Sequence, residues 1–384
     1  MTDIPDIQSL KVKIIRGGSS KGVFVHTENL PAPGPLRDQL VLRLFGAPDI
    51  RQIDGLGGGD KLTSKLAIMG SPTRTDCNIS FLFAQVGTEF PDLDWHSNCG
   101  NISSGAALFA AIEGAGHDRD GQQHIAIEQA NTGRRLLATI PMTGDAPATK
   151  GSFAIGGVPG TGPRIDLDFA DFDGSCLNKG LFPTGSRQQK LVLPDGKAIL
   201  ITVIDMANLN VIVHAADLGI DLTCPLNQLQ GNAELLDRLD HIRATVMIQL
   251  GQATLQTAAG IIRRSVNPLV HILATPQSYT DLGGAQIGAQ THDVLARSYA
   301  RSAFSKAYPG TGAIGIAVAM CIPGTNAAVF GQNAANAADL RIGHPSGCLS
   351  VSAEVRETAT GLNVESAKIG RTARVLMEGT AYLT

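Results

Sequence analysis

NCGNISSGAALFA, residues 98–110, places a polar turn with a single cysteine directly before an apolar run of small residues. AYPGTGAIGIAVAM, residues 307–320, repeats the same design of a glycine-rich turn followed by an apolar run. Alanine, glycine and isoleucine occupy every face of both runs at helical spacing, which predicts helices that are buried on all sides. Such helices would occur in an α+β protein in which each of two domains wraps a sheet around one central helix.

Short β-branched runs bounded by turn residues dominate the rest of the chain and predict strands in largely antiparallel sheets. These runs are KVKIIRGG, NISFLFAQVG, HIAIEQANTG, RRLLATIPM, KAILITVID, NVIVHAADLG and LVHILATP. Helical periodicity is clear in five places, at residues 35–44, 103–112, 232–245, 291–305 and 311–320.

The length of 384 residues exceeds the usual size of a single domain. CLNKGLFPTGSRQQ, residues 176–189, is poor in strand formers and carries glycine and proline. We therefore expect one domain at residues 1–185, which holds Lys65 and Cys99, and a second at residues 186–384, whose last strand can return to the first domain.

Charge and cysteine usage exclude several classes of protein. The net charge is −3, and the 31 basic residues are dispersed, which argues against nucleic acid as a partner. The N-terminus lacks a basic segment followed by an apolar one, and no run is long enough to cross a bilayer, so we expect no membrane partner and a cytoplasmic location. Six scattered cysteines without metal spacing predict free thiols and no metal site.

The cysteine of the opening stretch is the first candidate for chemistry. Cys99 lies at or just before a helix N-terminus, with Ser103 or Ser104 as candidate caps. Free backbone amides and the positive end of the helix dipole stabilise a thiolate, and the same amides bind a carboxylate or stabilise an enolate. A small buried cysteine packed under a helix start is the alternative, and the polar neighbours and nearby glycines favour function.

A glycine-rich turn, RQIDGLGGGDKLTSKLAIMG at residues 51–70, is the second candidate. It matches neither nucleotide motif, because Asp60 precedes Lys61 and replaces the third glycine of a dinucleotide fingerprint. The turn does deliver a second lysine, Lys65, to the start of an apolar run. Partial desolvation there makes Lys65 a candidate neutral base, whereas Lys61 fits better as a solvated loop lysine.

Three further turns are rich in groups that bind anions. RGGSSKG at residues 16–22 resembles a carboxylate clamp, GHPSG at residues 343–347 offers an imidazole and a hydroxyl, and DMANLN at residues 205–210 breaks a strand with amide side chains. Each is weak evidence alone. Taken with the cysteine turn, and without a metal or nucleotide motif, they point to a small polycarboxylate as the ligand.

Five motifs, in order along nearly the whole sequence, resemble those of the PrpF family. They are RGGSSKG, RQIDGLGGGDKLTSKLAI, NCGNISSGAALFA, YPGTGA and RIGHPSG. Members of this family include methylaconitate isomerase, 3-methylitaconate Δ-isomerase and 4-oxalomesaconate tautomerase. The resemblance implies the α+β diaminopimelate-epimerase-like fold of two pseudo-symmetric domains, each a β-barrel-like sheet wrapped around a central helix, with the active site in the cleft between them. It also implies a proton shift between allylic carbons of an unsaturated di- or tricarboxylate, without a cofactor.

By the same resemblance, Lys65 and Cys99 form the catalytic pair. The epimerase branch uses two cysteines at related helix starts, and Pro309 stands here at the second start, which disfavours racemisation by two thiols. The expected substrate-binding residues are Ser19, Ser20, Lys21, Asn98, Gly100, Asn101, Asn208, Gly310, Thr311, Gly312, His344 and Ser346. The Asn-Pro that often occurs in the family's mid-chain strand is Asn208-Leu209 here.

The sequence leaves the substrate and the direction of proton transfer open. We expect an isomerase acting on 3-methylitaconate or 4-oxalomesaconate, with Lys65 as base and Cys99 as acid or the reverse. Methylaconitate or cis/trans-aconitate isomerisation, amino-acid epimerisation and a non-catalytic accessory protein of an aconitase-like enzyme are the alternatives. A homo-oligomer would be ordinary for a chain of this length.

Overall fold

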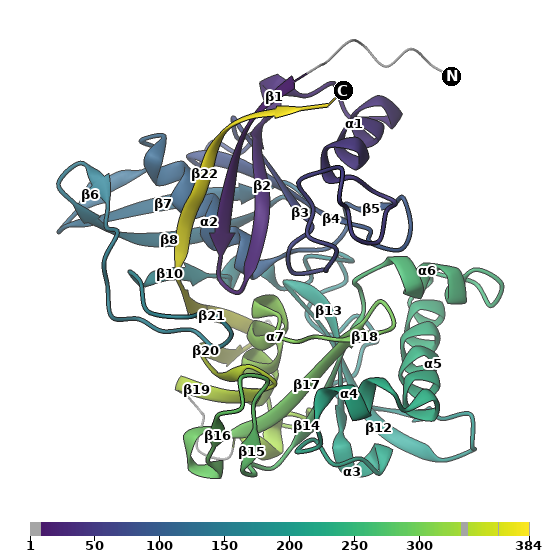
Figure 1. Ribbon diagram of the computed structural model, residues 1–384. Helices are drawn as coiled ribbons and strands as arrows, with labels where there is room; N and C mark the ends of the chain where they lie inside the picture. The colour runs from purple at the N-terminus through teal and green to yellow at the C-terminus, as the bar shows by residue number, and fades with distance from the viewer. Residues whose placement is uncertain (1–8, 332–336, 360, 384) are drawn as a thin grey trace. The chain divides into compact units, whose positions relative to one another are not determined.

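The computed structural model describes residues 9–331, 337–359 and 361–383, and its chain divides into two units (Figure 1). Unit 1 consists of Met1–Ala154, Val158–Leu167 and Arg371–Thr384, and unit 2 of Ile155–Gly157 and Asp168–Gly370. The boundary expected after residue 185 thus falls inside unit 2. Hydrogen bonds explain the difference, because Gly174 N donates to Asp205 O and Asp205 N donates to Leu181 O, which ties this segment to unit 2.

Among the residues that the structure describes, unit 1 is a mixed sheet with two helices. Its strands are β1 (Ser9–Gly17), β2 (Ser20–His26), β3 (Lys65–Gly70), β4 (Ile79–Val86), β5 (Leu93–Asp94), β6 (His117–Arg119), β7 (Gln122–Gln129), β8 (Arg134–Thr143), β9 (Ala146–Pro147) and β22 (Ala373–Tyr382). The helices are α1 (Pro35–Phe45) and α2 (Gly100–Ile112), with a short 3-10 turn η1 (Thr27–Asn29). The strand β10 (Ile165–Asp168) ends where the chain passes into unit 2.

The sheet of unit 1 encloses α2. Strand β1 pairs antiparallel with β2 and β22, β2 pairs parallel with β3, β3 antiparallel with β4, β4 parallel with β7, and β7 antiparallel with β8. Helix α2 contacts all of these strands, and every residue from Gly100 to Ala111 is buried. Helix α1 packs its apolar side chains, such as Leu40 and Phe45, into the separate core on the other side of β1, β2 and β3.

Unit 2 contains the remaining strands and five helices among the described residues. The strands are β11 (Gln189–Val192), β12 (Ala198–Met206), β13 (Asn208–His214), β14 (Leu269–Ala274), β15 (Tyr279–Thr280), β16 (Gln286–Ile287), β17 (Val294–Ala300), β18 (Ala303–Phe304), β19 (Ala337–His344), β20 (Gly347–Thr358) and β21 (Gly361–Arg371). The helices are α3 (Ala215–Leu218), α4 (Leu226–Gln230), α5 (Ala233–Gln249), α6 (Ala258–Arg264) and α7 (Gly310–Met320), and the 3-10 turns are η2 (Ala170–Phe172), η3 (Ala289–Thr291) and η4 (Ala328–Phe330).

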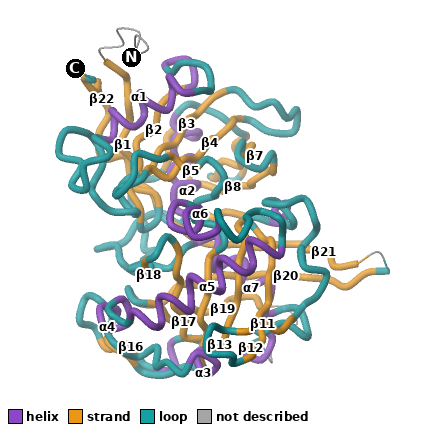
Figure 2. The backbone as a smooth tube through the Cα atoms, turned by 90° about the vertical axis from the view of Figure 1, so that its right-hand side faces the viewer, coloured by secondary structure: helices purple, strands orange, loops and turns teal. Residues whose placement is uncertain are grey.

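The pairing order of unit 1 is repeated in unit 2. Strand β12 pairs antiparallel with β13, β13 parallel with β14, β14 antiparallel with β17, β17 parallel with β19, and β19 antiparallel with β20. Helix α7 takes the place of α2 and is buried along its whole length against β12, β13, β19 and β20. Helix α5 covers the other face of the strands, as Figure 2 shows, and packs apolar side chains there. The expected fold of two related sheets, each around a central helix, is confirmed.

One predicted helix is wrong. The segment at residues 291–305 has helical periodicity, but it forms η3 and then the strand β17, whose seven residues are all buried. All seven residues of β17 are buried, so both faces of the strand are covered and its side chains carry no alternation of polar and apolar residues. Sheet pairing has therefore overridden the local preference for a helix.

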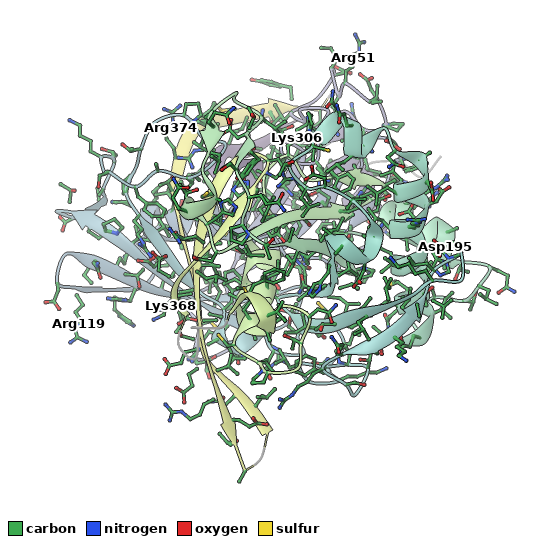
Figure 3. All side chains as sticks on the ribbon, turned by 90° about the horizontal axis from the view of Figure 1, so that it is seen from below. Arg51, Arg119, Asp195, Lys306, Lys368 and Arg374 are labelled. Carbon is green, nitrogen blue, oxygen red and sulfur yellow. The ribbon has the colours of Figure 1, made fainter. Side chains whose placement is uncertain are left out.

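Charged side chains lie mostly at the surface. Among those labelled in Figure 3, Arg119, Asp195 and Lys368 point outward, and the Arg119 and Lys368 side chains are 80% and 52% exposed. Across the described residues, no helix is both long and apolar enough to span a membrane.

Glycines set how closely α2 approaches the β1–β2 hairpin. A Cβ on Gly105 would lie 2.6 Å from Cζ of Phe24, and a Cβ on Gly17 would lie 2.9 Å from the backbone N of Gly105. Real Cβ atoms do not come this close, so the helix can reach its position only because both residues lack a side chain. This close packing fixes the first turn of α2 against the hairpin.

A buried polar network fixes the start of α7. His271 lies between Asn210 and Tyr308, with Nε2 2.9 Å from Asn210 Oδ1 and Nδ1 2.7 Å from the Tyr308 hydroxyl. The Asn210 Nδ2 group donates to the Met206 carbonyl, so its Oδ1 is the atom that accepts from His271 Nε2, and the Tyr308 hydroxyl donates to Nδ1. Burial lowers the pKa of His271 to about 3, so the ring is neutral at physiological pH.

The close packing of α2 predicts opposite outcomes for two glycine substitutions. Gly105→Ala should destabilise the protein by about 1–3 kcal/mol, because the new methyl group overpacks against Phe24. Gly260→Ala is the matched control, since Gly260 is also helical but has nothing within 4 Å of its Cβ position; it should stabilise by about 0.4–1 kcal/mol. Urea unfolding curves measure both, and equal shifts would show that α2 has room for a side chain.

Neutral His271 predicts an acid-sensitive stability. In the unfolded chain His271 is protonated near the ordinary pKa of 6.5, whereas in the folded chain its pKa is about 3. The free energy of unfolding therefore falls as the pH drops from 6.5 toward 3. The loss is about 1.4 kcal/mol per pH unit once His271 of the unfolded chain is protonated. The free energy of unfolding should be measured for wild type and His271→Gln between pH 6.5 and pH 5. The slopes of the two curves against pH should differ by an amount that corresponds to the uptake of up to one proton on unfolding. Parallel curves would contradict the buried neutral ring.

Candidate active site

Cys99 is the residue at which α2 begins. It is the N-cap residue, with extended backbone angles of φ −134° and ψ 98°, and its carbonyl accepts from Ser103 N at 2.9 Å. Its own amide donates to Asn98 Oδ1 at 2.7 Å. The Cys99 side chain makes no capping bond and is half-buried. The thiol therefore lies beside the amides of the first helical turn, where Gly100 and Asn101 have no carbonyl partner within the helix.

The expected capping role of Ser103 and Ser104 is wrong. The Ser103 hydroxyl donates to Cys99 O at 3.0 Å and the Ser104 hydroxyl donates to Asn101 O at 2.7 Å. Both hydroxyls are thus used inside the helix, as buried serines in a helix commonly are. Because no side chain caps the turn, its amides stay available to a ligand.

Lys65 is the first residue of β3 and its side chain is almost fully enclosed. The residue is 7% exposed, and Nζ donates to Gln85 Oε1 at 2.6 Å. The Gln85 Nε2 group in turn donates to Ser64 O at 2.9 Å, which orients the amide oxygen toward the lysine. Phe83 lies under the amine, with Nζ 5.2 Å from the ring centroid. The amine is held by a neutral amide and an aromatic face.

Gly22 links Lys65 to the first turn of α2. A Cβ on this residue would lie 3.0 Å from Cδ1 of Ile102 and 3.1 Å from the Lys65 carbonyl oxygen. The β2–β3 pairing and the burial of α2 against both strands bring these residues to one place. The sequence predicted Lys65 and Cys99 from separate motifs, and the structure positions both of them around the same hairpin.

The predicted serine clamp faces α2. Asn101 Nδ2 donates to Ser19 Oγ at 3.1 Å and to Ser20 Oγ at 3.3 Å. The two hydroxyl oxygens therefore act as acceptors, which leaves each hydroxyl hydrogen to donate to a second group. Lys21 follows Ser20 in β2, and strand alternation directs its side chain to the other face of the sheet. Of the three residues of this predicted clamp, the structure places the two serines beside α2.

In unit 2 the predicted residues gather around the start of α7. Asn208 Nδ2 donates to Thr311 Oγ1 at 2.7 Å, which repeats the contact between Asn101 and the serines of unit 1. The turn between β19 and β20 is closed by Ser346, whose N donates to His344 Nδ1 at 3.2 Å and whose Oγ donates to Lys306 O at 2.7 Å. Gly310 and Gly312 are buried in the first turn of α7.

The two units differ at the positions that matter for chemistry. Lys65 and Leu269 are both the first residue of the equivalent strands β3 and β14. Cys99 and Pro309 are both the N-cap residue of the equivalent helices α2 and α7. An amine and a thiol in unit 1 thus correspond to two apolar side chains in unit 2. The acid and base candidates belong to one unit, so a symmetric two-thiol site is not formed by these positions.

Sequence reasoning missed two residues of this site. Gln85 left a signal, since it is a polar residue in the apolar strand FLFAQV. Arg371 left none, because it is the last residue of β21, 270 residues after Asn101 in the sequence. It is 3% exposed, and its Nε donates to Asn101 Oδ1 at 3.0 Å. Within the residues that the structure describes, no group of three or more metal-ligating side chains is present.

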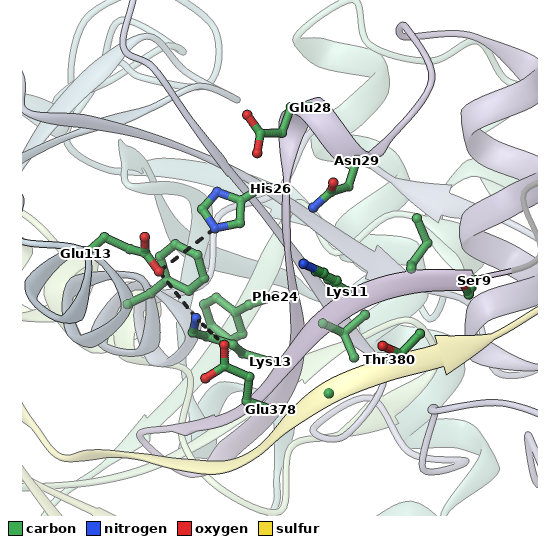
Figure 4. Close-up of a pocket in the computed structure, with 14 residues that line it drawn as sticks. Ser9, Lys11, Lys13, Phe24, His26, Glu28, Asn29, Glu113, Glu378 and Thr380 are labelled. Atoms are coloured by element: carbon green, nitrogen blue, oxygen red, sulfur yellow. Dashed lines mark hydrogen bonds and ion pairs between the residues drawn. The ribbon is translucent and has the colours of Figure 1, made fainter.

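A pocket of about 840 Å³ lies at the other end of α2. Figure 4 shows Glu113 near Lys13 and His26, with the Lys13 amine 3.3 Å from Glu113 and 3.0 Å from Glu378. None of the predicted site residues lines it, and its α2 residue Phe109 is about 15 Å along the helix from Cys99 at 1.5 Å per residue. Its charges are largely paired with one another, and the candidate residues Cys99, Gly100 and Asn101 lie at the opposite end of α2.

Comparisons with known proteins identify the family of the chain. The PrpF protein family matches residues 7–384. The chain is 36% identical to 3-methylitaconate isomerase of Eubacterium barkeri, over 96% of both chains. It is 34% identical to 2-methyl-aconitate isomerase of Shewanella oneidensis, over 95% of this chain and 94% of that protein.

Solved structures confirm the fold. The crystal structure of methylitaconate-delta-isomerase superposes with a TM-score of 0.81 at 35% identity, covering 97% of this chain and 95% of that one. A hydroxyproline epimerase from Agrobacterium vitis gives a TM-score of 0.54 at 12% identity, covering 98% and 93%, which shows a shared epimerase-like fold alone. The chain belongs to the PrpF protein family and is an enzyme of the isomerase class.

Proposed function

We propose that this isomerase catalyses a cofactor-independent 1,3-allylic proton shift in a small unsaturated di- or tricarboxylate, with Lys65 and Cys99 as the acid/base pair. The observation that carries the proposal is the position of these two groups around one hairpin of unit 1. The amine is enclosed by Gln85 and Phe83, and the thiol lies at a helix start whose first turn has no side-chain cap.

The reaction needs only these groups and a place for negative charge. A base removes a proton from the carbon next to the double bond, and the electron pair of that C–H bond forms a new C=C bond. The electrons of the original double bond move into the conjugated carboxylate, which gives a dienolate. An acid then protonates the far allylic carbon, so the double bond has moved and no electrons have left the molecule. Free amides and hydroxyls near the carboxylate stabilise the charge that develops on its oxygens.

Unit 1 supplies donors of this kind. The amides of Gly100 and Asn101 lie in the first turn of α2, where the helix dipole is positive. The hydroxyls of Ser19 and Ser20 lie beside the same turn. We propose Lys65 as the base and Cys99 as the acid, and the reverse assignment uses the same atoms. The unit 2 residues Asn208, Gly310, Thr311, Gly312, His344 and Ser346 stay predictions for further carboxylate contacts.

We propose 3-methylitaconate or 4-oxalomesaconate as the substrate, with methylaconitate or cis/trans-aconitate as the alternative. This chain is 36% identical to the relative named 3-methylitaconate isomerase and 34% identical to the one named 2-methyl-aconitate isomerase. Sequence identity therefore does not decide between these two substrates. Amino-acid epimerisation is disfavoured, because Leu269 and Pro309 stand where a second acid or base would be needed. An accessory protein that binds a polycarboxylate without turnover is the non-enzymatic alternative.

Proton exchange in D2O, followed by NMR, tests the reaction directly. The panel is 3-methylitaconate, 4-oxalomesaconate, 2-methylaconitate, cis-aconitate and a diamino acid. We expect double-bond migration and deuterium at an allylic carbon with one or more of the unsaturated acids, and no exchange at the α-carbon of the diamino acid. Binding of a panel member without any exchange would favour the accessory role.

Substitution of the two groups should abolish this exchange. Lys65→Met and Cys99→Ala should each slow turnover by about 10²–10⁴-fold, the usual contribution of a positioned acid or base. Lys61→Met and Cys321→Ala are the matched controls, since Lys61 lies in the same glycine-rich turn and Cys321 is at the far end of the equivalent helix α7; both should retain the wild-type rate. Turnover at the wild-type rate in Lys65→Met or Cys99→Ala would remove that residue from the mechanism.

A further inference from the structure

The glycine-rich turn before β3 closes around the side chain of Gln52. This side chain is 1% exposed, and its Oε1 accepts from Gly59 N at 3.0 Å and from the Ser64 hydroxyl. Its Nε2 donates to Gly87 O at 3.3 Å. A Cβ on Gly57 would lie 2.1 Å from Gln52 Oε1, so only glycine fits at that position. The turn is therefore built around an amide side chain of the protein itself.

Gln52 holds an unusual backbone conformation. Its φ is +50°, in the left-handed region that residues with a long side chain rarely adopt. Asp49 holds the chain there, because its carbonyl accepts from Gln52 N at 2.8 Å and its Oδ2 accepts from Ile53 N at 3.0 Å. Conformations of this kind persist where the surroundings enforce them, and they cluster at functional sites.

Ser64 connects Gln52 to Lys65. It is fully buried and directly precedes Lys65 in the chain. Its hydroxyl donates to Gln52, and its carbonyl accepts from Gln85 Nε2 at 2.9 Å and from Val86 N at 3.1 Å. Ser64 is thus held at its side chain by the glycine-rich turn and at its carbonyl by β4, so a shift of Gln52 would also move the carbonyl that orients Gln85.

The orientation of Gln85 decides which of its atoms Lys65 meets. Gln85 Nε2 donates to Ser64 O at 2.9 Å and to Val86 O at 3.4 Å, so Oε1 faces the Lys65 amine, 2.6 Å away. An amide oxygen can only accept, so it takes one N–H of the amine and leaves the nitrogen lone pair unused. The reversed amide would direct an NH₂ group at that lone pair and its oxygen at two carbonyl oxygens. The network therefore leaves a neutral Lys65 amine free to accept a proton.

We propose that Gln52 is a positioning residue for Lys65, which acts through Ser64 and Gln85, and that the glycine-rich turn serves to hold it. The proposal deepens the proposed function and rests on it, since it concerns the residue named there as base. It also gives the turn a role that fits its failure to match a nucleotide-binding motif, because its glycines enclose an amide of the chain. A displacement of about 1 Å at a catalytic group can slow turnover by about 10²-fold, so the support of the base affects the rate directly.

Turnover of an active substrate tests the link between Gln52 and Lys65. Gln52→Asn keeps a residue type that tolerates positive φ, but its amide is one methylene too short to reach the Ser64 hydroxyl. We expect kcat to fall by about tenfold or more and KM to change by less than about twofold, because the base is misplaced while the contacts to the carboxylates remain. Ser64→Ala cuts the same link from the other side and should give the same result, also if Gln52→Asn does not fold. Normal kcat in these variants would overturn the proposal.

Gln230→Asn is the matched control. Gln230 forms the same pair of backbone bonds in unit 2, where its Oε1 accepts from Phe304 N at 2.9 Å and its Nε2 donates to Ser302 O at 3.1 Å. Shortening this side chain removes a comparable amide anchor but leaves the network of Lys65 intact, so kcat should stay at the wild-type value. An equal fall of kcat in the control would show a general structural effect and overturn the proposal.

Labelling of Lys65 with acetic anhydride tests the network without turnover. The reagent is neutral and acylates only unprotonated amines, so the pH dependence of labelling, read at the Lys65 peptide by mass spectrometry, follows the loss of the amine's proton. Gln85→Glu sets a carboxylate against the amine and should move this curve to higher pH by about 1–3 units. Combined with Gln52→Asn, the same substitution should give about half of that shift or less, because residue 85 is no longer held in place. Combined with Gln230→Asn, it should give the full shift.

The two readouts separate this inference from the proposed function. A labelling shift that depends on Gln52, together with no turnover of any panel member, would keep the network and reject the proposed reaction. Turnover that depends on Lys65, together with a full labelling shift in the Gln52→Asn background, would keep the reaction and overturn this inference. No shift in Gln85→Glu would show that residue 85 does not face the amine and would overturn it as well.

Discussion

The burial of α2 on every face is the constraint on which the site depends. A helix enclosed by strands has no solvated side, so its residues must be small or apolar, and its polar groups are confined to its ends. Gly17 and Gly105 allow the hairpin and the helix to meet at van der Waals distance. The first turn of α2 is therefore held against Ser19 and Ser20, and its amides are oriented before any ligand arrives.

The same architecture occurs in both units, but the residues at the start of the central helix differ between them. Strand order, pairing direction and the buried central helix agree between the units. In unit 1 the start of the helix carries Cys99 and the neighbouring strand starts with Lys65. In unit 2 the equivalent positions hold Pro309 and Leu269, and a neutral His271 network fixes the start of α7 instead. Duplication of the fold thus does not imply duplication of the chemistry.

The sequence predicts those features that depend on local pattern. The two apolar runs of small residues identified both central helices, and short β-branched runs identified the strands, because burial on all sides and strand pairing leave compositional marks. The prediction of a helix at residues 291–305 was wrong because β17 is buried on both faces. A strand buried on both faces has no alternation of polar and apolar residues to distinguish it from a helix. Ser103 and Ser104 failed as caps because a hydroxyl can bond inside the helix as readily as at its end.

The site was predicted in part, for a related reason. Cys99, Lys65 and the serines stand in glycine-rich turns that are visible in the sequence, whereas Arg371 comes from a strand 270 residues after its partner Asn101, and only the fold brings them together.

The most direct test of the account is a crystal structure of Cys99→Ala with 3-methylitaconate bound. We predict a carboxylate within hydrogen-bond distance of the Gly100 or Asn101 amide, with Lys65 Nζ facing the allylic carbon. A ligand bound instead in the pocket beside Lys13 and Glu113 would contradict it.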